Sequence, residues 1–348
     1  MMNRRTFVRA AALGVSTVAA PGVLRGEPMA KIRIGTAPFL SSGPIYIAQT
    51  KGFFRKVGLE VELTSFADGS LAIPALVAGE LDATVATLNA GLFNALSSGG
   101  SYKLVLDRGS DKQGFGSTTI LVSNKLYDAG ATSVDKFGML KGARFSMQVP
   151  GGIDHYLLAR GLQRAGLDPR KDAIYSSGLT YPDIIKSLGA GIADAAQIPV
   201  PLAFLAETNS AAKILCTGAD IEPGAQLACW AMPKKFLETN RKAAVAFAMA
   251  HIYAARLFVE AATNKDPGII KILSDGSKIP GPLIEKAAPR WTGFDKEGAV
   301  DTASVLRQAD FWVNTMKLIP GPVAKDDIFD PSVASEAAAI LSASNPFV

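Results

Sequence analysis

The stretch ALVAGELDATVAT, residues 75–87, decides the fold because a related stretch, SLGAGIADAAQIP, occupies residues 187–199. In both, a run of helix-forming residues meets a glycine that can take the left-handed cap conformation, and small apolar residues suited to a buried strand follow. The aspartate of each stretch stands where that strand begins, and we expect a turn or capping role for it rather than catalysis. Four positions recur 112 residues apart: Leu76, Gly79, Asp82 and Ala83 match Leu188, Gly191, Asp194 and Ala195. The chain therefore contains two copies of one helix–strand unit.

The duplication extends beyond these two stretches. The sequence predicts a strand, a helix and a strand over residues 31–39, 45–58 and 59–66, and again over 143–149, 154–166 and 172–177. Gly43 matches Gly151 and Gly58 matches Gly166 at an offset of 108, so an insertion of four residues reconciles the two registers. Alternating strands and helices of this length predict parallel sheets covered by helices on both faces.

Segments outside the two copies indicate how the lobes are connected. Strands are expected at 117–123, 211–218 and 226–233, and a long helix begins at residue 241. We expect the chain to cross back near residues 225–233 and its C-terminal part to pack on the first lobe. The predicted fold class is α/β with two lobes, each a mostly parallel sheet flanked by helices, and a ligand cleft between the lobes. The predicted boundaries are 31–115 for the first part of lobe I, 116–228 for lobe II, and 229–348 for the return to lobe I and the C-terminal helices.

Composition limits the class of protein. The 348 residues are 48% hydrophobic, which is enough to fill two cores, and the formal net charge is +5. Four arginines and a single acidic residue lie in the first thirty residues, so the remainder is nearly balanced in charge and holds no cluster of Lys and Arg for binding phosphates. We therefore expect no nucleic-acid partner, and we expect a monomer.

The first thirty residues are typical of an export signal. A basic start precedes an apolar run, residues 10–24, which Gly and Pro interrupt and which small residues suited to cleavage follow. Residues 3–9, NRRTFVR, resemble the twin-arginine signal; an ordinary N-terminal helix is the alternative. We expect no other apolar segment of membrane-spanning length, and hence a periplasmic protein exported by the twin-arginine route. In that compartment Cys216 and Cys229 could form a disulfide or remain two buried thiols.

The position of a ligand site follows from the predicted sheets. Ligands of open parallel sheets bind beyond the carboxyl ends of the strands, where backbone N–H groups and helix N-termini are free. Applied to both copies, this rule selects six loops: residues 38–43, 67–70, 87–89, 150–155, 178–181 and 197–199. We expect these loops to face each other around a hinge.

A family resemblance lies in three stretches that follow one another along the chain: GPIYIAQTKGFFRKVGLEVEL (43–63), ADGSLAIPALVAGELDATVAT (67–87) and LKGARFSMQVPGG (140–152). The chain resembles the periplasmic substrate-binding proteins of ABC importers in the nitrate, sulfonate and taurine group, which includes thiamine-precursor-synthase-like proteins. The resemblance covers residues 30–240 and implies a type II periplasmic-binding-protein fold, a hinge, and delivery of a small-molecule solute to a membrane permease. Where members of this group commonly have Glu-Pro, this chain has QIPVP at 197–201.

The side chains of the six loops indicate the kind of solute. None of the loops contains Lys or Arg, so a strongly anionic solute would be held by backbone N–H groups, helix N-termini and hydroxyls. Asp154 is expected to cap a helix there and to compete with an anion. Aromatic side chains would suit a planar or partly apolar ligand, with core packing as the alternative for each. The candidate ligand-binding residues are Phe39, Ser41, Ser42, Gly43, Gly69, Ser70, Thr87, Asn89, Gly151, Gly152, His155, Tyr181 and Gln197.

Signatures of catalysis are absent from the sequence. It contains no G-x-S-x-G elbow, no G-x-x-x-x-G-K-[ST] loop, no H-E-x-x-H and no C-x-x-C, and it lacks the cysteine-rich motif of the fungal relatives that make a thiamine pyrimidine. We therefore assign no catalytic residue, metal ligand or cofactor. The expected function is solute binding by hinge closure for an ABC importer, with a small organic or oxyanionic solute. A small-molecule enzyme on the same scaffold and a ligand-binding sensor are the alternatives.

Overall fold

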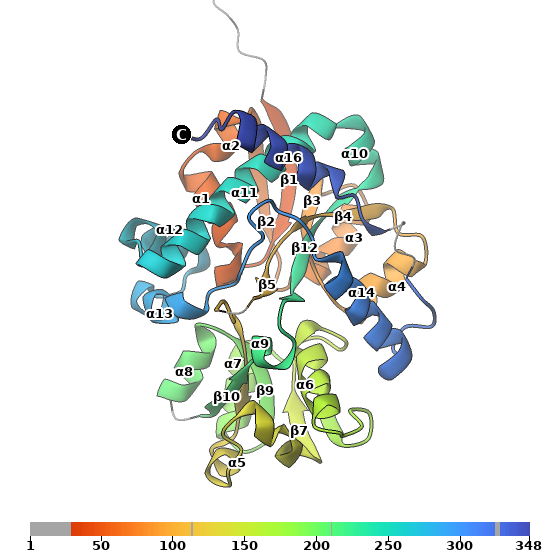
Figure 1. Ribbon diagram of the computed structural model, residues 1–348, viewed down its shortest axis with the longest axis vertical. Coiled ribbons are helices and arrows are strands. Elements are labelled where there is room, and N and C mark those ends of the chain that lie inside the picture. Colours follow the sequence, from red (N-terminus) through yellow and green to blue (C-terminus); the bar gives the residue numbers. More distant parts are fainter. Residues whose placement is uncertain (1–28, 113, 210, 324–327) are drawn as a thin grey trace, which may run out of the picture.

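The computed structural model describes residues 29–348 except 113, 210 and 324–327. The predicted export segment, residues 1–30, lies almost entirely outside the described residues. The described chain forms two α/β lobes, one above the other in Figure 1, and each lobe is built on a five-stranded sheet. The two-lobe α/β prediction is confirmed.

The two sheets have the same strand order. The first sheet has the order β2-β1-β3-β12-β4 and the second has the order β8-β7-β9-β6-β10. In both, the first three strands are parallel, and the next strand, β12 or β6, runs antiparallel to both of its neighbours. The strands of the first sheet are β1 (Ala30–Thr36), β2 (Leu59–Ser65), β3 (Ala83–Thr87), β4 (Tyr102–Asp107) and β12 (Ala228–Pro233). Those of the second are β6 (Thr118–Val122), β7 (Ala143–Ser146), β8 (Ala173–Ser176), β9 (Ala195–Pro199) and β10 (Lys213–Thr217).

A short ribbon connects the lobes. Strand β5 (Ser110–Asp111) pairs antiparallel with β11 (Ala225–Gln226), so the two crossings lie side by side between the lobes (Figure 1). The Gln226 side chain donates hydrogen bonds to Asp107 Oδ1 at 2.5 Å and to the Gly109 carbonyl at 3.0 Å. The crossing therefore occurs where the sequence predicted it, near residues 225–233.

Helices connect and cover the strands. The repeated sequence stretch forms α3 followed by β3 in the first lobe and α7 followed by β9 in the second, as predicted. The helices up to the second crossing are α1 (Gly43–Thr50), α2 (Phe53–Lys56), α3 (Ile73–Val77), α4 (Ala90–Ser97), α5 (Asn124–Asp128), α6 (Ile153–Arg164), α7 (Tyr181–Gly189), α8 (Leu202–Thr208) and α9 (Gly218–Ile221). The later ones are α10 (Lys234–Thr239), α11 (Arg241–Asn264), α12 (Pro267–Ser277), α13 (Gly281–Ala287), α14 (Thr302–Asp310) and α16 (Ser332–Ala343). Short 3-10 or π turns are η1 (Leu40–Ser42), η2 (Gly69–Ala72), η3 (Val134–Leu140), η4 (Ala288–Arg290) and η5 (Phe311–Thr315).

The prediction of one helix over residues 45–58 is wrong, because the structure has two helices there. Gly52 lies between α1 and α2 with a φ of 70°, a left-handed conformation that ends the first helix. The chain turns there so that Phe53 and Phe54 become buried in the first lobe.

Helix α11 corrects the expectation that no other segment reaches membrane-spanning length. Its 24 residues have a mean hydropathy of 1.4 in the most apolar window, so length and composition alone would allow a span. However, 67% of that window is buried inside the fold, where α11 packs against α1 and α16. Its apolar character is therefore that of a core helix.

The C-terminal part of the chain does not pack on the first lobe alone. While α11 and α16 do so, η5 follows α14 and contacts α6 of the second lobe. The Trp312 ring lies 5.3 Å from the His155 ring and 6.0 Å from the Tyr156 ring, and Phe311 packs edge-on against Tyr156 at 5.2 Å. Phe311 and Trp312 of η5 therefore pack on the second lobe.

The two cysteines remain unpaired. Cys216 lies in β10 of the second sheet and Cys229 in β12 of the first, and both are buried free thiols. Burial raises the pKa of the Cys216 thiol to about 12 and that of Cys229 well above its usual value. Of the two alternatives left open by the sequence, the structure has the buried thiols.

Candidate functional site

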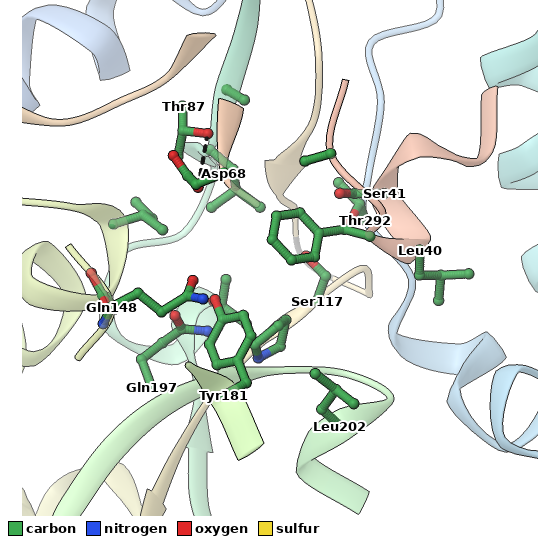
Figure 2. Close-up of a pocket in the computed structure, with 18 of the residues that line it drawn as sticks. Leu40, Ser41, Asp68, Thr87, Ser117, Gln148, Tyr181, Gln197, Leu202 and Thr292 are labelled. Atoms are coloured by element: carbon green, nitrogen blue, oxygen red, sulfur yellow. Dashed lines mark hydrogen bonds between the residues drawn. The ribbon is translucent and has the colours of Figure 1, made fainter. Parts of the chain in front are cut away.

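A cavity of about 330 Å³ lies between the two lobes. Each of the six loops selected from the sequence contributes at least one lining residue. Further lining comes from the two crossings, with Ser117 and Leu227, and from the C-terminal part, with Ser277 and Thr292. Figure 2 shows Asp68, Gln148 and Gln197 toward the left of the view, and Leu40 and Leu202 toward the right together with Ser41 and Thr292.

Just over half of the candidate ligand-binding residues line this cavity. They are Phe39, Ser41, Thr87, Asn89, Gly152, Tyr181 and Gln197. The others lie behind the lining: Ser42, Gly43, Gly69, Ser70, Gly151 and His155. The loops selected from the sequence thus line the cavity, but the sequence did not decide which residue of each loop faces it.

The two serines behind the lining are used within the protein. Ser42 is buried; its Oγ donates to the Ala37 carbonyl at 2.5 Å and accepts from Arg108 Nη2 at 2.7 Å. Ser70 donates to Asp68 Oδ1 from its backbone N–H at 2.8 Å and from its hydroxyl at 2.5 Å. Asp68, rather than Ser70, is therefore the N-cap of this turn.

The three glycines behind the lining permit close packing. A side chain at Gly43 would begin 2.4 Å from the Phe258 ring, and one at Gly69 would begin 2.6 Å from the Val85 carbonyl oxygen. Gly151 has a φ of 73°, and a Cβ there would lie 2.6 Å from that of Ala90. These positions need glycine to bring elements together.

His155 also has a packing role. Its Nδ1 accepts a hydrogen bond from the Gly151 backbone N–H at 3.1 Å, and its ring packs on Tyr175 at 4.4 Å. Burial lowers the pKa of His155 to about 4, so the imidazole is neutral at neutral pH.

Two acidic residues line the cavity, one from each lobe. Asp68 accepts from Ser70 and, at 3.4 Å, from the Thr87 hydroxyl, as the dashed line in Figure 2 shows. Asp154 is 4% exposed and accepts from the Gln148 N–H at 2.6 Å and the His155 N–H at 2.8 Å. Burial raises the pKa of Asp154 to about 6, and repulsion by Asp68 acts in the same direction. Asp68 was not among the sequence candidates, although its place before Gly-Ser was a signal for an N-cap.

One basic residue, Arg108, lines the cavity at the first crossing. Its guanidinium donates to Ser42 and lies 6.0 Å from the centre of the Trp230 ring. Desolvation lowers the pKa of Arg108 to about 10, which leaves it charged at neutral pH. Arg108 is 3% exposed, and its Nε has no hydrogen-bond partner.

Two amides of the lining differ in how they are used. Asn89 is the N-cap of α4, where its Oδ1 accepts from the Leu92 N–H at 2.7 Å. Gln197, in β9, is 1% exposed, and its Oε1 has no hydrogen-bond partner. This Oε1 is closed off from the cavity, which Gln197 lines through other atoms of its side chain.

The lobes touch on either side of the cavity. Phe39 from the first lobe meets Tyr181 from the second edge-on, with ring centroids 6.2 Å apart. The Ala90 N–H of the first lobe donates to the Gly151 carbonyl of the second at 2.9 Å. The cavity is therefore enclosed by contacts that domain opening would break.

His and Cys do not occur among the described lining residues. Within the described part of the chain, no group of three or more His, Cys, Asp or Glu could hold a metal ion. His155 does not line the cavity, and neither Cys216 nor Cys229 does. Hydroxyl groups of the lining do contact carboxylates: Thr87 donates to Asp68 at 3.4 Å, and Ser117 donates to Asp111 at 3.3 Å.

Comparison with known proteins gives relatives and a fold. The nitrate import ATP-binding protein NrtC of Synechococcus elongatus is 26% identical over 231 residues, which are 65% of this chain and 35% of NrtC. The chain thus spans about a third of that relative. The putative binding protein YtlA of Bacillus subtilis is 24% identical over 243 residues, 69% of each chain.

Solved structures share the fold at low sequence identity. The periplasmic nitrate-binding protein NrtA of Synechocystis has a TM-score of 0.74 at 17% identity, covering 92% of this chain and 91% of NrtA. The alkanesulfonate-binding protein SsuA of Xanthomonas axonopodis, bound to MOPS, has a TM-score of 0.69 at 20% identity, covering 87% and 99%. The desulfurization enzyme DSZB is similar at a TM-score of 0.57 and 14% identity, covering 89% and 99%. The fold is therefore that of periplasmic binding proteins. Residues 25–274 match the NMT1-like family, and the chain belongs to that family.

Proposed function

We propose that the protein is the extracytoplasmic solute-binding component of an ABC importer. It binds a small organic or oxyanionic solute between lobe I (31–115 and 229–348) and lobe II (116–228), and it presents the closed form to a permease. The observation that carries this proposal is the cavity itself, which is lined by loops of both lobes and enclosed by contacts between them. A ligand that touches both lobes binds best in the closed state and therefore favours closure.

The relatives support an import role. NrtC is named as an ATP-binding protein of nitrate import, and YtlA is named as a putative binding protein. NrtA is a nitrate-binding protein, and SsuA is an alkanesulfonate-binding protein. The matched lengths and identities leave the solute of this chain open, so its identity is addressed by experiment.

The experiment is thermal unfolding of the mature chain against taurine, alkylsulfonates, nitrate, bicarbonate, small amines, pyrimidines and aromatic carboxylates. A ligand at a hundred times its dissociation constant stabilises the protein by about 2.7 kcal/mol. Small-angle scattering of the same samples should show a smaller radius of gyration with that ligand. A ligand that binds without compaction would contradict hinge closure.

An enzyme is the second candidate, because DSZB shares the fold. The two functions differ in the fate of the ligand: a receptor releases it unchanged, and an enzyme does not. Mass spectrometry of the recovered ligand decides between them, and a changed mass would overturn the receptor function.

Export by the twin-arginine route is part of the proposal. It rests on the sequence NRRTFVR at residues 3–9. Replacing Arg4 and Arg5 together by Lys should retain the full-length precursor in the cytoplasm. Unchanged export of that variant would exclude this route.

A further inference from the structure

The charge of the cavity lining is set by Asp68 and Asp154. Asp68 belongs to the first lobe, Asp154 to the second, and both side chains are at least nine-tenths buried. Neither carboxylate forms an ion pair with any residue in the described part of the chain. Their hydrogen-bond partners are neutral backbone N–H groups and hydroxyls, and these leave acceptor capacity on both carboxylates.

Arg108 does not compensate these two charges. Among the described lining residues it is the single basic one, against two acidic ones, and it is engaged with Ser42 and with the Trp230 ring. The carboxylate that attracts it is Asp107, which is buried and lies outside the lining. With all three ionised, the lining carries a net charge of −1.

Two further groups of the lining are buried without a partner. Gln197 Oε1 and Arg108 Nε have no hydrogen-bond partner, but both atoms are closed off from the cavity, so neither is open to a solute. The class of solute therefore follows from the two carboxylates.

Electrostatics between the lobes indicates the same chemistry. Burial raises the pKa of Asp154 and of Tyr181; repulsion by Asp68 acts in the same direction on Asp154, and both carboxylates do so on Tyr181. Closing the lobes around an anion would add a third negative charge to this repulsion, whereas a cation would relieve it.

We propose that the solute is a small, partly apolar amine whose protonated nitrogen lies between Asp68 and Asp154. The nitrogen forms charge-assisted hydrogen bonds with carboxylates of both lobes, so it stabilises the closed arrangement directly. The remainder of the molecule contacts Phe39 and the apolar part of the lining. This inference rests on the proposed function, because it takes the cavity as the solute site.

The test uses matched probes and isothermal titration calorimetry on the mature chain. Butylamine, benzylamine and phenethylamine are compared with the corresponding alcohols and with butyrate, benzoate and phenylacetate. We expect at least one amine to bind at least tenfold more tightly than its alcohol, and its carboxylate not to bind. Binding of carboxylates, sulfonates or nitrate with no binding of amines would overturn the amine inference and leave the receptor function in place. Binding of no probe at all would also overturn the amine inference, whereas the receptor function is decided by the wider thermal-unfolding screen.

Variants locate the effect in the cavity. Asp68→Asn and Asp154→Asn keep the shape and remove the charge, and each should weaken amine binding at least tenfold while the alcohol is unaffected. Asp275→Asn removes a charge from an exposed pair with Lys271 and should change neither affinity. Equal weakening of amine and alcohol in the cavity variants would mean that the carboxylates only hold the loops, and it would overturn the inference.

Discussion

Arg33 and Asp82 are joined in the first lobe by three hydrogen bonds: Asp82 accepts from the Arg33 backbone N–H at 2.8 Å, from Nε at 3.1 Å and from Nη2 at 2.7 Å. Arg144 and Asp194 repeat this arrangement in the second lobe at 2.9, 2.8 and 2.9 Å. In each pair the aspartate N–H also donates to the arginine carbonyl at 2.8 Å. The aspartates of the repeated sequence stretch therefore anchor the start of β3 and β9, a structural role as expected.

Replacing Asp82 by Ala removes the acceptor of a backbone N–H and an ion pair at once. Leaving the backbone N–H without an acceptor lowers the free energy of unfolding by about 1–3 kcal/mol. Loss of the ion pair adds little to this, because the Arg33 side chain is half-exposed. Each kcal/mol corresponds to about 2–4 °C in Tm for a chain of this size class. Differential scanning calorimetry should show this loss, while Asp275→Ala, which breaks an exposed pair, should leave Tm nearly unchanged. Equal Tm values for the two variants would contradict the anchoring role.

Gly151→Ala should impair closure of the lobes. The new Cβ would lie 2.6 Å from that of Ala90, at the point where the lobes share a backbone hydrogen bond. Gly142→Ala is the matched control, because its φ of 75° imposes similar backbone strain but nothing lies within 4 Å of its Cβ. We expect both variants to lose stability, and Gly151→Ala alone to lose ligand-induced compaction in small-angle scattering. Compaction of Gly151→Ala equal to that of the control would show that this contact is not needed for closure.

Phe39→Ala should weaken binding of any solute by destabilising the closed state. Its edge contact with Tyr181 is worth about 0.5–1.5 kcal/mol, which corresponds to an affinity loss of roughly two- to tenfold. Phe39→Leu keeps apolar volume and should lose less. The measurement is calorimetric titration of the solute identified by the screen, and an Ala variant with unchanged affinity would contradict the role of this contact.

Amine affinity should depend on pH through Asp154. Because the pKa of this carboxyl is raised to about 6, an ammonium group must displace its proton at lower pH. Affinity should therefore rise by up to about tenfold per pH unit toward pH 6 and level off above it. The ligand stays protonated, since an alkylamine has a pKa near the lysine value of about 10.

Groups next to Asp154 should not disturb this profile. The pKa of His155 is lowered to about 4 and that of Tyr181 is raised well above its usual value, so both stay neutral between pH 5 and 8. Titrations of Asp154→Asn at several pH values provide the control and should give a flatter profile. A wild-type profile that falls as pH rises through 6 would exclude the assignment.

The sequence predicted the fold well because the two copies need the same backbone conformations at matching positions. Gly79 and Gly191 have φ values of 77° and 68°, and strands of small residues follow both. Contacts that depend on side-chain geometry were not predictable: the partner of Asp82 is 49 residues away. The packing of Trp312 on α6 was missed because nothing local to residues 311–315 specifies a contact with the second lobe.

All six loops predicted from the topology line the cavity, whereas only some of the residues predicted in them do. Topology places the loops at the carboxyl ends of strands, and Asn89, Tyr181 and Gln197 lie there. Whether a residue faces the cavity or the core depends on the exact path of a turn. In this turn Ser42 points into the core and Ser41 faces the cavity. Lining residues such as Ser277 and Thr292 come from a segment with no counterpart in the repeat.

The position of β12 between β3 and β4 has a consequence for the order in which the chain folds. All strands of the second sheet lie within residues 118–217, whereas the first sheet needs β12 at 228–233 to join β3 to β4. As the chain leaves the ribosome, the second lobe can complete its sheet while the first still has two unpaired edges at its centre. A nascent chain ending at residue 227 would thus contain one finished lobe and one that is split in two.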